Sequence, residues 1–218
     1  MARLARSNPN LTREAVIEAA AAVLERDGHG GLTMRAVAAE LKVQAPALYW
    51  HVANKQALEV ALYDHLMTGL EFAPVGDDWR EDVRRMAWAL RRHLLSRRDI
   101  GRLVPNGFFV APNTMTMMEV ALGVLLDAGL KPRDAFYAFA TCFGYVVNWS
   151  IREGDIRARP QDVQFGLDAE GRALLKTGAY PRLITTTKAF ADPGSIDEQF
   201  AFGLNCLISG FERLVAEA

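Results

Sequence analysis

Apolar residues recur every three to four positions along most of the chain, and charged or small polar residues fill the positions between them. This spacing places the apolar side chains on one face of an α-helix. Alternation typical of strands, bounded by hairpin signals, is missing from the sequence. The pattern predicts an all-α fold, with helices over about 12–27, 33–40, from 44 onward, 54–71, 78–98, 113–128, 133–152 and 196–216.

Capping and helix-breaking residues divide the chain into parts. Short polar side chains that cap helix N-termini precede three of the first helices, at Thr12, Thr33 and Asn54. Gly28 ends the first helix, and Pro74 with Gly76 closes the fourth. We expect a flexible basic arm at 1–10, a small helical domain at 11–58 and a larger one at 59–218.

One long connection interrupts the helical pattern. Residues 154–195 contain eight glycine or proline residues and separate the last two predicted helices. An irregular segment of this length in a compact domain is usually functional or disordered. A short helix at about 169–176 is the one element that we expect inside it.

Composition narrows the class of protein. The chain is 50% hydrophobic and 23% charged with a net charge of −1, so any nucleic-acid contact must come from a local patch. The first ten residues lack the apolar segment of a signal peptide, and the uncharged stretch 135–151 is short and polar for a bilayer span. Cys142 and Cys206 lack metal-site spacing. We expect a cytoplasmic protein with no membrane partner.

The segment LTMRAVAAELKVQAPALYWH, residues 32–51, has the organisation of a helix-turn-helix. Pro46 suits a first helical turn, where its missing amide costs no hydrogen bond. The second helix would present its N-terminal turn and the end at Tyr49, Trp50 and His51 to a DNA groove. The alternative is a set of alanine-rich helices that never contacts DNA, and the pattern alone leaves both open.

The sequence contains little evidence for a catalytic or a metal site. The glycine-rich run 28–31 resembles an oxyanion-hole loop, but no G-x-S-x-G nucleophile motif accompanies it, and a helix stop explains it better. The histidines His51, His65 and His93 lack the spacing of zinc ligands. We predict no enzymatic activity, no metal and no cofactor.

Residues 11–58, with LTMRAVAAELKVQAPALYWHVANKQAL at their centre, closely resemble the DNA-binding domain of TetR-family transcriptional regulators. The resemblance continues through Trp79, the segment 94–99, Tyr180-Pro181 and the ending FAFGLNCLISGFERL, which look like the tetracycline-repressor branch. It implies an N-terminal three-helix helix-turn-helix domain that binds double-stranded DNA, and a larger helical domain for ligand binding and dimerisation.

The resemblance also implies which residues contact DNA. They are Arg35, Gln44, Ala45, Pro46, Ala47, Tyr49, Trp50, His51 and Lys55. Arg35 and Gln44 have long polar ends that reach base edges, whereas Lys55 suits a phosphate. Ala45 and Ala47 depart from the polar residues of tetracycline repressors and offer only methyl groups. For Trp50 the alternative is packing against the following helix.

Two uncharged helices, 135–151 and 199–211, are apolar around most of their circumference. One monomer's core covers only part of such a surface, and in the family the corresponding helices form a four-helix dimer interface. We therefore expect a homodimer in which Cys142 and Cys206 are small buried residues; a monomer with deeply buried helices is the alternative.

The arginine-rich helix 78–98 suggests either a second nucleic-acid face or solvated arginines paired with acidic neighbours.

On the family's body, a set of apolar residues is expected to line a central ligand cavity: Met86, Leu90, Val104, Phe108, Met118, Phe139 and Phe143. Ordinary core packing is the alternative for each. Tetracycline repressors hold a magnesium-chelated drug with a histidine and a carboxylate, and those positions align with Val104 and Arg152, although Glu153 could slip into the second. Neither Val104 nor Arg152 suits a hard cation.

Together these features predict a homodimeric, one-component regulator, a repressor that a small and mostly apolar ligand releases from a palindromic operator. Two other classes of protein stay open. One is an enzyme, disfavoured by the missing nucleophile, base and cofactor motifs. The other is a ligand-binding or scaffolding protein that has lost DNA binding.

Overall fold

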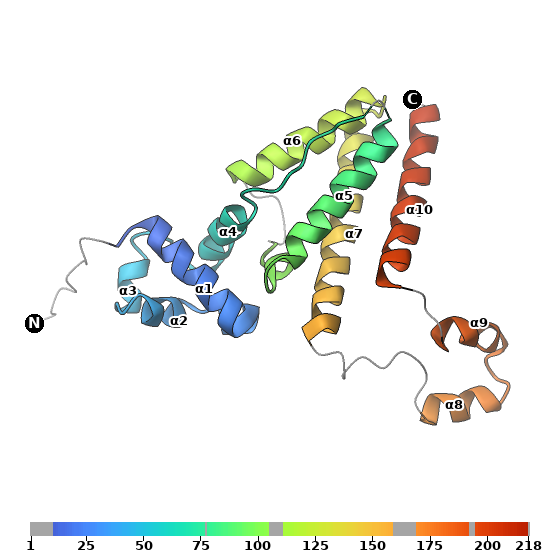
Figure 1. Ribbon diagram of the computed structural model, residues 1–218, viewed down its shortest axis with the longest axis horizontal. Coiled ribbons are helices and arrows are strands. Elements are labelled where there is room, and N and C mark those ends of the chain that lie inside the picture. Colours follow the sequence, from blue (N-terminus) through green and yellow to red (C-terminus); the bar gives the residue numbers. More distant parts are fainter. Residues whose placement is uncertain (1–10, 77, 105–110, 159–168, 192–194, 218) are drawn as a thin grey trace, which may run out of the picture.

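The computed structural model describes residues 11–217, except residues 77, 105–110, 159–168 and 192–194. The expected basic arm at 1–10 lies outside these residues. Within the described part every regular element is a helix, which confirms the all-α prediction (Figure 1). The elements are α1 (Arg13–Gly31), α2 (Met34–Glu40), α3 (Ala45–Leu48), α4 (Lys55–Leu66), α5 (Trp79–Leu95), the 3₁₀ helix η1 (Ile100–Leu103), α6 (Pro112–Asp127), α7 (Pro132–Ala158), α8 (Ala169–Lys176), α9 (Pro181–Ala191) and α10 (Ile196–Ala216).

Helices α1 to α4 form an N-terminal bundle around a small apolar core. The predicted caps are present: the side chains of Thr12, Thr33 and Asn54 accept hydrogen bonds from the backbone amides of Ala15, Ala36 and Ala57. Each bond satisfies an amide that the helix leaves without an internal partner. The core of the bundle includes the fully buried residues Val16, Val23, Leu32, Val37, Leu48, Leu58 and Leu62.

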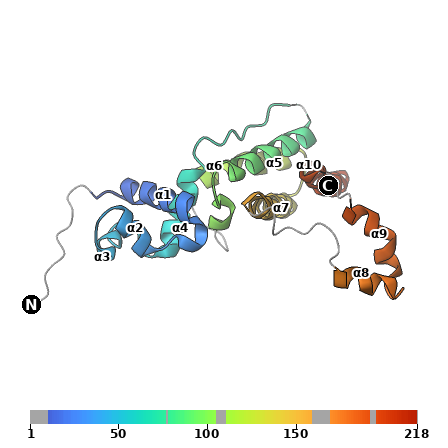
Figure 2. The same cartoon turned by 60° about the horizontal axis from the view of Figure 1, so that its bottom comes forward.

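The other large unit, the body, consists of α5, η1, α6, α7 and α10. Helix α7 packs against α5, α6 and α10, so it lies in the middle of the body, and Figure 2 shows it nearly end-on between α5 and α10. Its buried apolar side chains, Ala135, Ala138, Val146 and Val147, are small or branched and permit close helix packing. The bundle lies on one side of the body and α10 on the other, with α8 and α9 beyond α10 (Figure 1).

Helix boundaries differ from the predictions in several places. Helix α1 continues to Gly31, past Gly28, whose φ of 72° interrupts the helical path, and α5 ends at Leu95 instead of at about residue 98. Helix α4 ends at Leu66, five residues before the expected end, and α7 runs on to Ala158. Helix α9 is not among the predicted elements, because glycine and proline residues around Pro181 are typical of an irregular connection. Proline is well tolerated in a first helical turn, and here Pro181 begins the helix instead of breaking it. The helix expected at 169–176 is confirmed as α8.

One arginine of α5 contradicts the expectation that the arginines of this helix are solvated. Arg91 is buried, and its guanidinium lies 2.7 Å from a carboxylate oxygen of Glu153 on α7 and 2.6 Å from one of Asp197 on α10. It also lies 4.7 Å from the ring centres of Trp88 and Phe200. The other expectation, pairing with acidic neighbours, holds for Arg80 with Glu212 and for Arg84 with Glu81. Arg91 therefore joins three helices of the body.

Among the described residues, no helix is both long and apolar enough to cross a membrane.

Candidate nucleic-acid interface and apolar cavity

The turn between α2 and α3 has a defined geometry. The backbone amides of Lys42 and Val43 donate to the carbonyls of Ala39 and Ala38, at 3.0 and 2.9 Å. This is the Schellman arrangement, which satisfies the last carbonyls of a helix and turns the chain sharply. It requires a left-handed residue, and Lys42 fills that position with φ of 55°. The turn fixes the direction in which α3 leaves α2.

Helix α3 is a single turn that one buried residue anchors. Leu48 is fully buried and Val52 nearly so, and together they tie α3 and the segment after it to the core of the bundle. Gln44 is the N-cap residue, but its side chain makes no capping hydrogen bond and is exposed. Pro46 lies in the first turn, as the sequence predicted. The N-terminal turn of α3 therefore presents the Gln44 amide to solvent.

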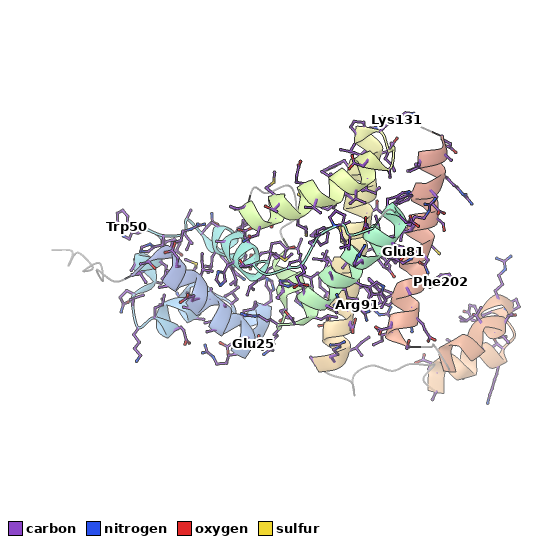
Figure 3. All side chains as sticks on the ribbon, turned by 45° about the horizontal axis from the view of Figure 1, so that its top comes forward. Glu25, Trp50, Glu81, Arg91, Lys131 and Phe202 are labelled. Carbon is purple, nitrogen blue, oxygen red and sulfur yellow. The ribbon has the colours of Figure 1, made fainter. Side chains whose placement is uncertain are left out.

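The residues after α3 form the tip of the N-terminal bundle. Tyr49 is 52% exposed and Trp50 is 88% exposed. Figure 3 shows Trp50 at the end of the molecule farthest from α10. An exposure this high contradicts the alternative in which Trp50 packs against the following helix. Tyr49 and Trp50 therefore leave two adjacent aromatic side chains uncovered at the tip.

Lys55 begins α4 beside this tip. Its ammonium nitrogen lies 3.4 Å from a carboxylate oxygen of Glu59, one helical turn later. The Nε2 atom of His29 lies 3.0 Å from the same oxygen. Glu59 therefore holds Lys55 at the surface while His29 shares the acceptor, and a DNA phosphate could replace Glu59 as the partner of Lys55.

The structure brings all the expected DNA-contacting residues to one part of the bundle, on α2, α3 and the start of α4. Arg35, Gln44, Pro46, Tyr49 and Trp50 are exposed, whereas Ala45, Ala47, His51 and Lys55 are half-buried. Long polar, aromatic and basic side chains on one surface can contact base edges, sugars and phosphates. Their individual roles stay predictions.

An apolar cavity of about 40 Å³ lies inside the body. Its walls come from α5, α6, α7, α10 and the segment before α5. Of the residues expected to line a ligand site, Met86, Leu90, Phe139 and Phe143 do so. Val104 and Met118 are half-buried beside the core and do not line this cavity, and Phe108 lies outside the described residues.

Ten lining residues lie outside the expected set: Phe72, Val83, Ala87, Met117, Ala121, Leu125, Ala138, Cys142, Val146 and Phe211. Of these, Ala121 is a position that the resemblance aligns with a drug-binding residue of tetracycline repressors. The alanines carry a signal that could have been used, since Ala87, Ala121 and Ala138 put small side chains on inward faces of three helices and so leave space between them. The sequence contains no comparable signal for Phe72. It lies in the segment before α5, and only the tertiary structure places it in the cavity wall.

The lining of the cavity is almost entirely apolar. The rings of Phe139 and Phe143 are stacked, with centres 5.7 Å apart. The polar group in the wall is the thiol of Cys142, and burial raises its pKa to about 11, so it is neutral at physiological pH. Such a wall suits an uncharged apolar or aromatic molecule and offers no oxygen ligand to a hard cation.

The positions aligned with the drug-binding residues of tetracycline repressors have other tasks here. Arg152 is exposed and its guanidinium lies 5.2 Å from the ring centre of Trp149. Glu153, the alternative carboxylate, is buried and accepts hydrogen bonds from Arg91 and Arg157. Its charge is already paired, so it is poorly placed to bind a metal–drug complex.

Helices α7 and α10 carry large apolar side chains on the surface. Phe136, Tyr137, Phe202 and Leu214 are between 39% and 73% exposed, with Phe202 the most exposed (Figure 3). Cys206 is exposed as well, because it lies on the outer face of α10, away from the core residues Leu204 and Ile208, and Cys142 is half-buried. The expectation that both are buried concerns the dimer and stays a prediction.

Comparisons with known proteins agree with this architecture. Residues 16–62 match the family model of bacterial regulatory proteins of the tetR family, and residues 73–215 match the tetracyclin repressor-like C-terminal domain. The chain is 33% identical over 211 residues to the class C tetracycline repressor protein of Escherichia coli, covering 94% of this chain and 92% of the relative.

Two solved structures are similar over almost the whole chain. ActR of Streptomyces coelicolor in complex with (S)-DNPA superposes with a TM-score of 0.76 at 27% identity, covering 95% of this chain and 98% of that one. A TetR variant of Acinetobacter baumannii AYE in complex with minocycline gives 0.68 at 32% identity, covering 94% and 98%. The helix-turn-helix tip, the helical body and these matches show that the chain belongs to the TetR family of DNA-binding transcriptional regulators.

Proposed function

We propose that the protein is a cytoplasmic, homodimeric repressor that binds a palindromic DNA operator and leaves it when a small, mostly apolar ligand enters the body. The observation that carries the DNA-binding part is the exposed tip of the N-terminal bundle. Arg35 and Gln44 supply donors and acceptors for base edges there, and Trp50 supplies an uncovered aromatic surface.

The surface of α7 and α10 supports the homodimer. Exposed phenylalanine, tyrosine and leucine side chains on two adjacent helices form the kind of patch that soluble proteins cover by association. Two-fold symmetry would place two identical tips on one face of the dimer, and each tip would contact one half of a palindrome.

The cavity supports the apolar ligand. Neighbours in the family bind (S)-DNPA and minocycline in their structures, which are organic molecules. A volume of about 40 Å³ is far below the roughly 300 Å³ or more of ordinary ligand sites. We infer that a ligand of ordinary size binds a state in which α5, α6 and α7 have moved apart. A ligand with higher affinity for that state than for the DNA-binding one lowers operator affinity.

Regulators of this family are generally non-enzymatic DNA-binding proteins. We infer that this chain follows them, because the polar group in the cavity wall is one neutral thiol. A ligand-binding protein without DNA binding is the second candidate, and the apolar cavity alone would serve it equally well.

A gel shift with the DNA upstream of the protein's own gene separates the candidates. We expect a shifted band that survives excess nonspecific competitor DNA at physiological salt. A matched protein with Trp50→Ala and Gln44→Ala should lose this band and retain its helical circular dichroism. Binding that the competitor removes equally for both proteins would favour the ligand-binding protein without DNA recognition.

A further inference from the structure

Helix α4 belongs to the N-terminal bundle but its far end is fastened to the body. Lys55, an expected phosphate contact, lies in its first turn. In its last turn, the Leu66 carbonyl accepts a hydrogen bond from Nε2 of His93 on α5, at 2.6 Å. One helix therefore runs from the DNA-binding tip to the body, where it contacts α6 and η1 (Figure 1).

Asp64 makes the second attachment, and it does so by capping a helix of the body. Its Oδ1 atom accepts hydrogen bonds from the backbone amide and the hydroxyl of Thr114, at 3.1 and 3.3 Å. The Asn113 amide group donates to the Asp64 backbone carbonyl at 2.9 Å. The N-cap residue of α6 is Ala111, whose side chain cannot cap. Asp64 supplies from α4 the carboxylate that the start of α6 lacks.

The same helix α6 forms a wall of the cavity. Met117, Ala121 and Leu125 line it, at one-turn intervals after Thr114. Thr114 itself is 3% exposed, so its hydrogen bonds to Asp64 are shielded from competing water. A displacement of α6 by a molecule in the cavity must either carry Asp64 with it or break these bonds.

We propose that Asp64 is the positioning residue that couples the cavity to the DNA-binding tip, by holding the end of α4 on the first turn of α6. This inference rests on the proposed function, since it concerns how that function is regulated. The chain of contacts runs from Ala121 along α6 to Thr114, across to Asp64, and along α4 to Lys55. Asp64 itself lies outside both the cavity lining and the expected DNA contacts.

A cavity-filling substitution can replace the unidentified ligand in the test. Ala121→Phe adds a ring to a cavity of about 40 Å³, and we expect this overpacking to push α6 outward. Leu126→Phe is the matched control, because Leu126 is an exposed residue on the same helix. Operator affinity is measured on a duplex that the wild-type protein selects from random DNA, in the wild-type and Asp64→Ala backgrounds.

We expect Ala121→Phe to weaken operator binding by about tenfold or more when Asp64 is present, and by less than about threefold in the Asp64→Ala protein. Leu126→Phe should change affinity little in either background. Asp64→Asn should restore the large effect, because its amide oxygen can accept the same bonds. Equal losses in both backgrounds, or no loss with Asp64 present, would overturn the proposal.

Amide hydrogen exchange gives a second measurement that needs no cavity variant. Because coupling is reciprocal, saturating operator DNA should slow exchange at the Thr114 amide in the wild-type and Asp64→Asn proteins, but not in Asp64→Ala. The same slowing in all three proteins would contradict the role of Asp64. A wild-type protein that selects no duplex would instead refute the proposed function, so the two failures are distinguishable.

Discussion

Lys55 and Gln44 lie on the same part of the N-terminal bundle but suit different parts of DNA. The ammonium group of Lys55 is a point charge, and any DNA phosphate can take the place of Glu59 as its partner. The Gln44 amide has a donor and an acceptor that match particular base edges. We therefore expect substitution of Lys55 to change the affinity for all DNA, and substitution of Gln44 to change the sequence preference.

Lys55→Ala should weaken binding to all duplexes by a similar factor and lower the slope of log affinity against log salt by about 0.9. Gln44→Ala and Arg35→Ala should each cost about 1–3 kcal/mol on the selected duplex and change which sequences bind. Fluorescence anisotropy over a salt series on selected and single-base-changed duplexes measures both effects. Uniform losses for all three variants would remove the assignment of base contacts.

Arg91 allows a stability prediction at the same scale. Arg91→Ala leaves the carboxylate of Glu153 buried without its main partner, and breaking a buried pair costs about 3–5 kcal/mol. Arg84→Ala is the control, because its pair with Glu81 is largely exposed and should contribute below about 1 kcal/mol. Urea denaturation compares the free energies of unfolding. Similar losses for both variants would show that the Arg91 cluster is not a buried cross-link.

The helical pattern could not predict the burial of Arg91. Helical periodicity placed it on the flank of an apolar stripe, where arginines are usually solvated. Its carboxylate partners are 62 and 106 residues away in the sequence, so only tertiary structure brings them together. By contrast, the capping residues Thr12, Thr33 and Asn54 were predictable, because each acts on an amide three residues later.

The prediction at the scale of elements concerns the outer faces of α7 and α10. A Cβ atom added at Gly210 would meet nothing within 4 Å, so Gly210→Glu leaves the single chain undisturbed but puts a charge into the proposed dimer interface. We expect a dimer for the wild-type protein and a monomer for this variant in sedimentation at micromolar concentration. Gly123→Glu on α6, where a Cβ also has open space, is the matched control and should remain dimeric.

Thiol labelling reports on the same surface. Cys206 lies on the exposed face of α10 and should react with a maleimide faster in Gly210→Glu than in the wild-type dimer, where the partner would cover it. Cys142 should react slowly in both, because burial raises its pKa to about 11 and little thiolate forms at pH 8. Equal labelling of Cys206 in both proteins, or a monomeric wild type, would argue against this interface.

Element boundaries were predictable where a local signal marks them. Helix α5 begins within a residue of its expected start because Asp78 caps it, and α10 does so because Ser195 and Glu198 form a capping box. Helix α9 was missed because glycine and proline around it were taken for loop residues. The lining of the cavity was predictable only in part, since four helices and a connecting segment must be positioned before their inward faces are known.

The whole molecule combines a DNA-binding bundle with a small apolar cavity, and this combination predicts its ligand response. Tetracycline with magnesium should neither bind tightly nor release operator DNA. Val104 and the exposed Arg152 are the residues that we align with the metal-binding histidine and carboxylate of tetracycline repressors, and Glu153 is already paired. Calorimetric titration with and without magnesium tests this. Tight binding that depends on magnesium and dissociates the DNA would show that the alignment and the assigned cavity are wrong.

The most direct test of the central claim is selection of a duplex from random DNA, followed by the stoichiometry and salt dependence of its binding. A homodimer with two tips predicts a palindromic sequence whose half-site centres are about 10 base pairs, or a multiple of that, apart. It also predicts two protomers for each duplex and a preference over a scrambled duplex that persists at physiological salt. Operator recognition would be contradicted if the protein bound selected and scrambled duplexes with equal affinity and lost both affinities together as the salt concentration rises.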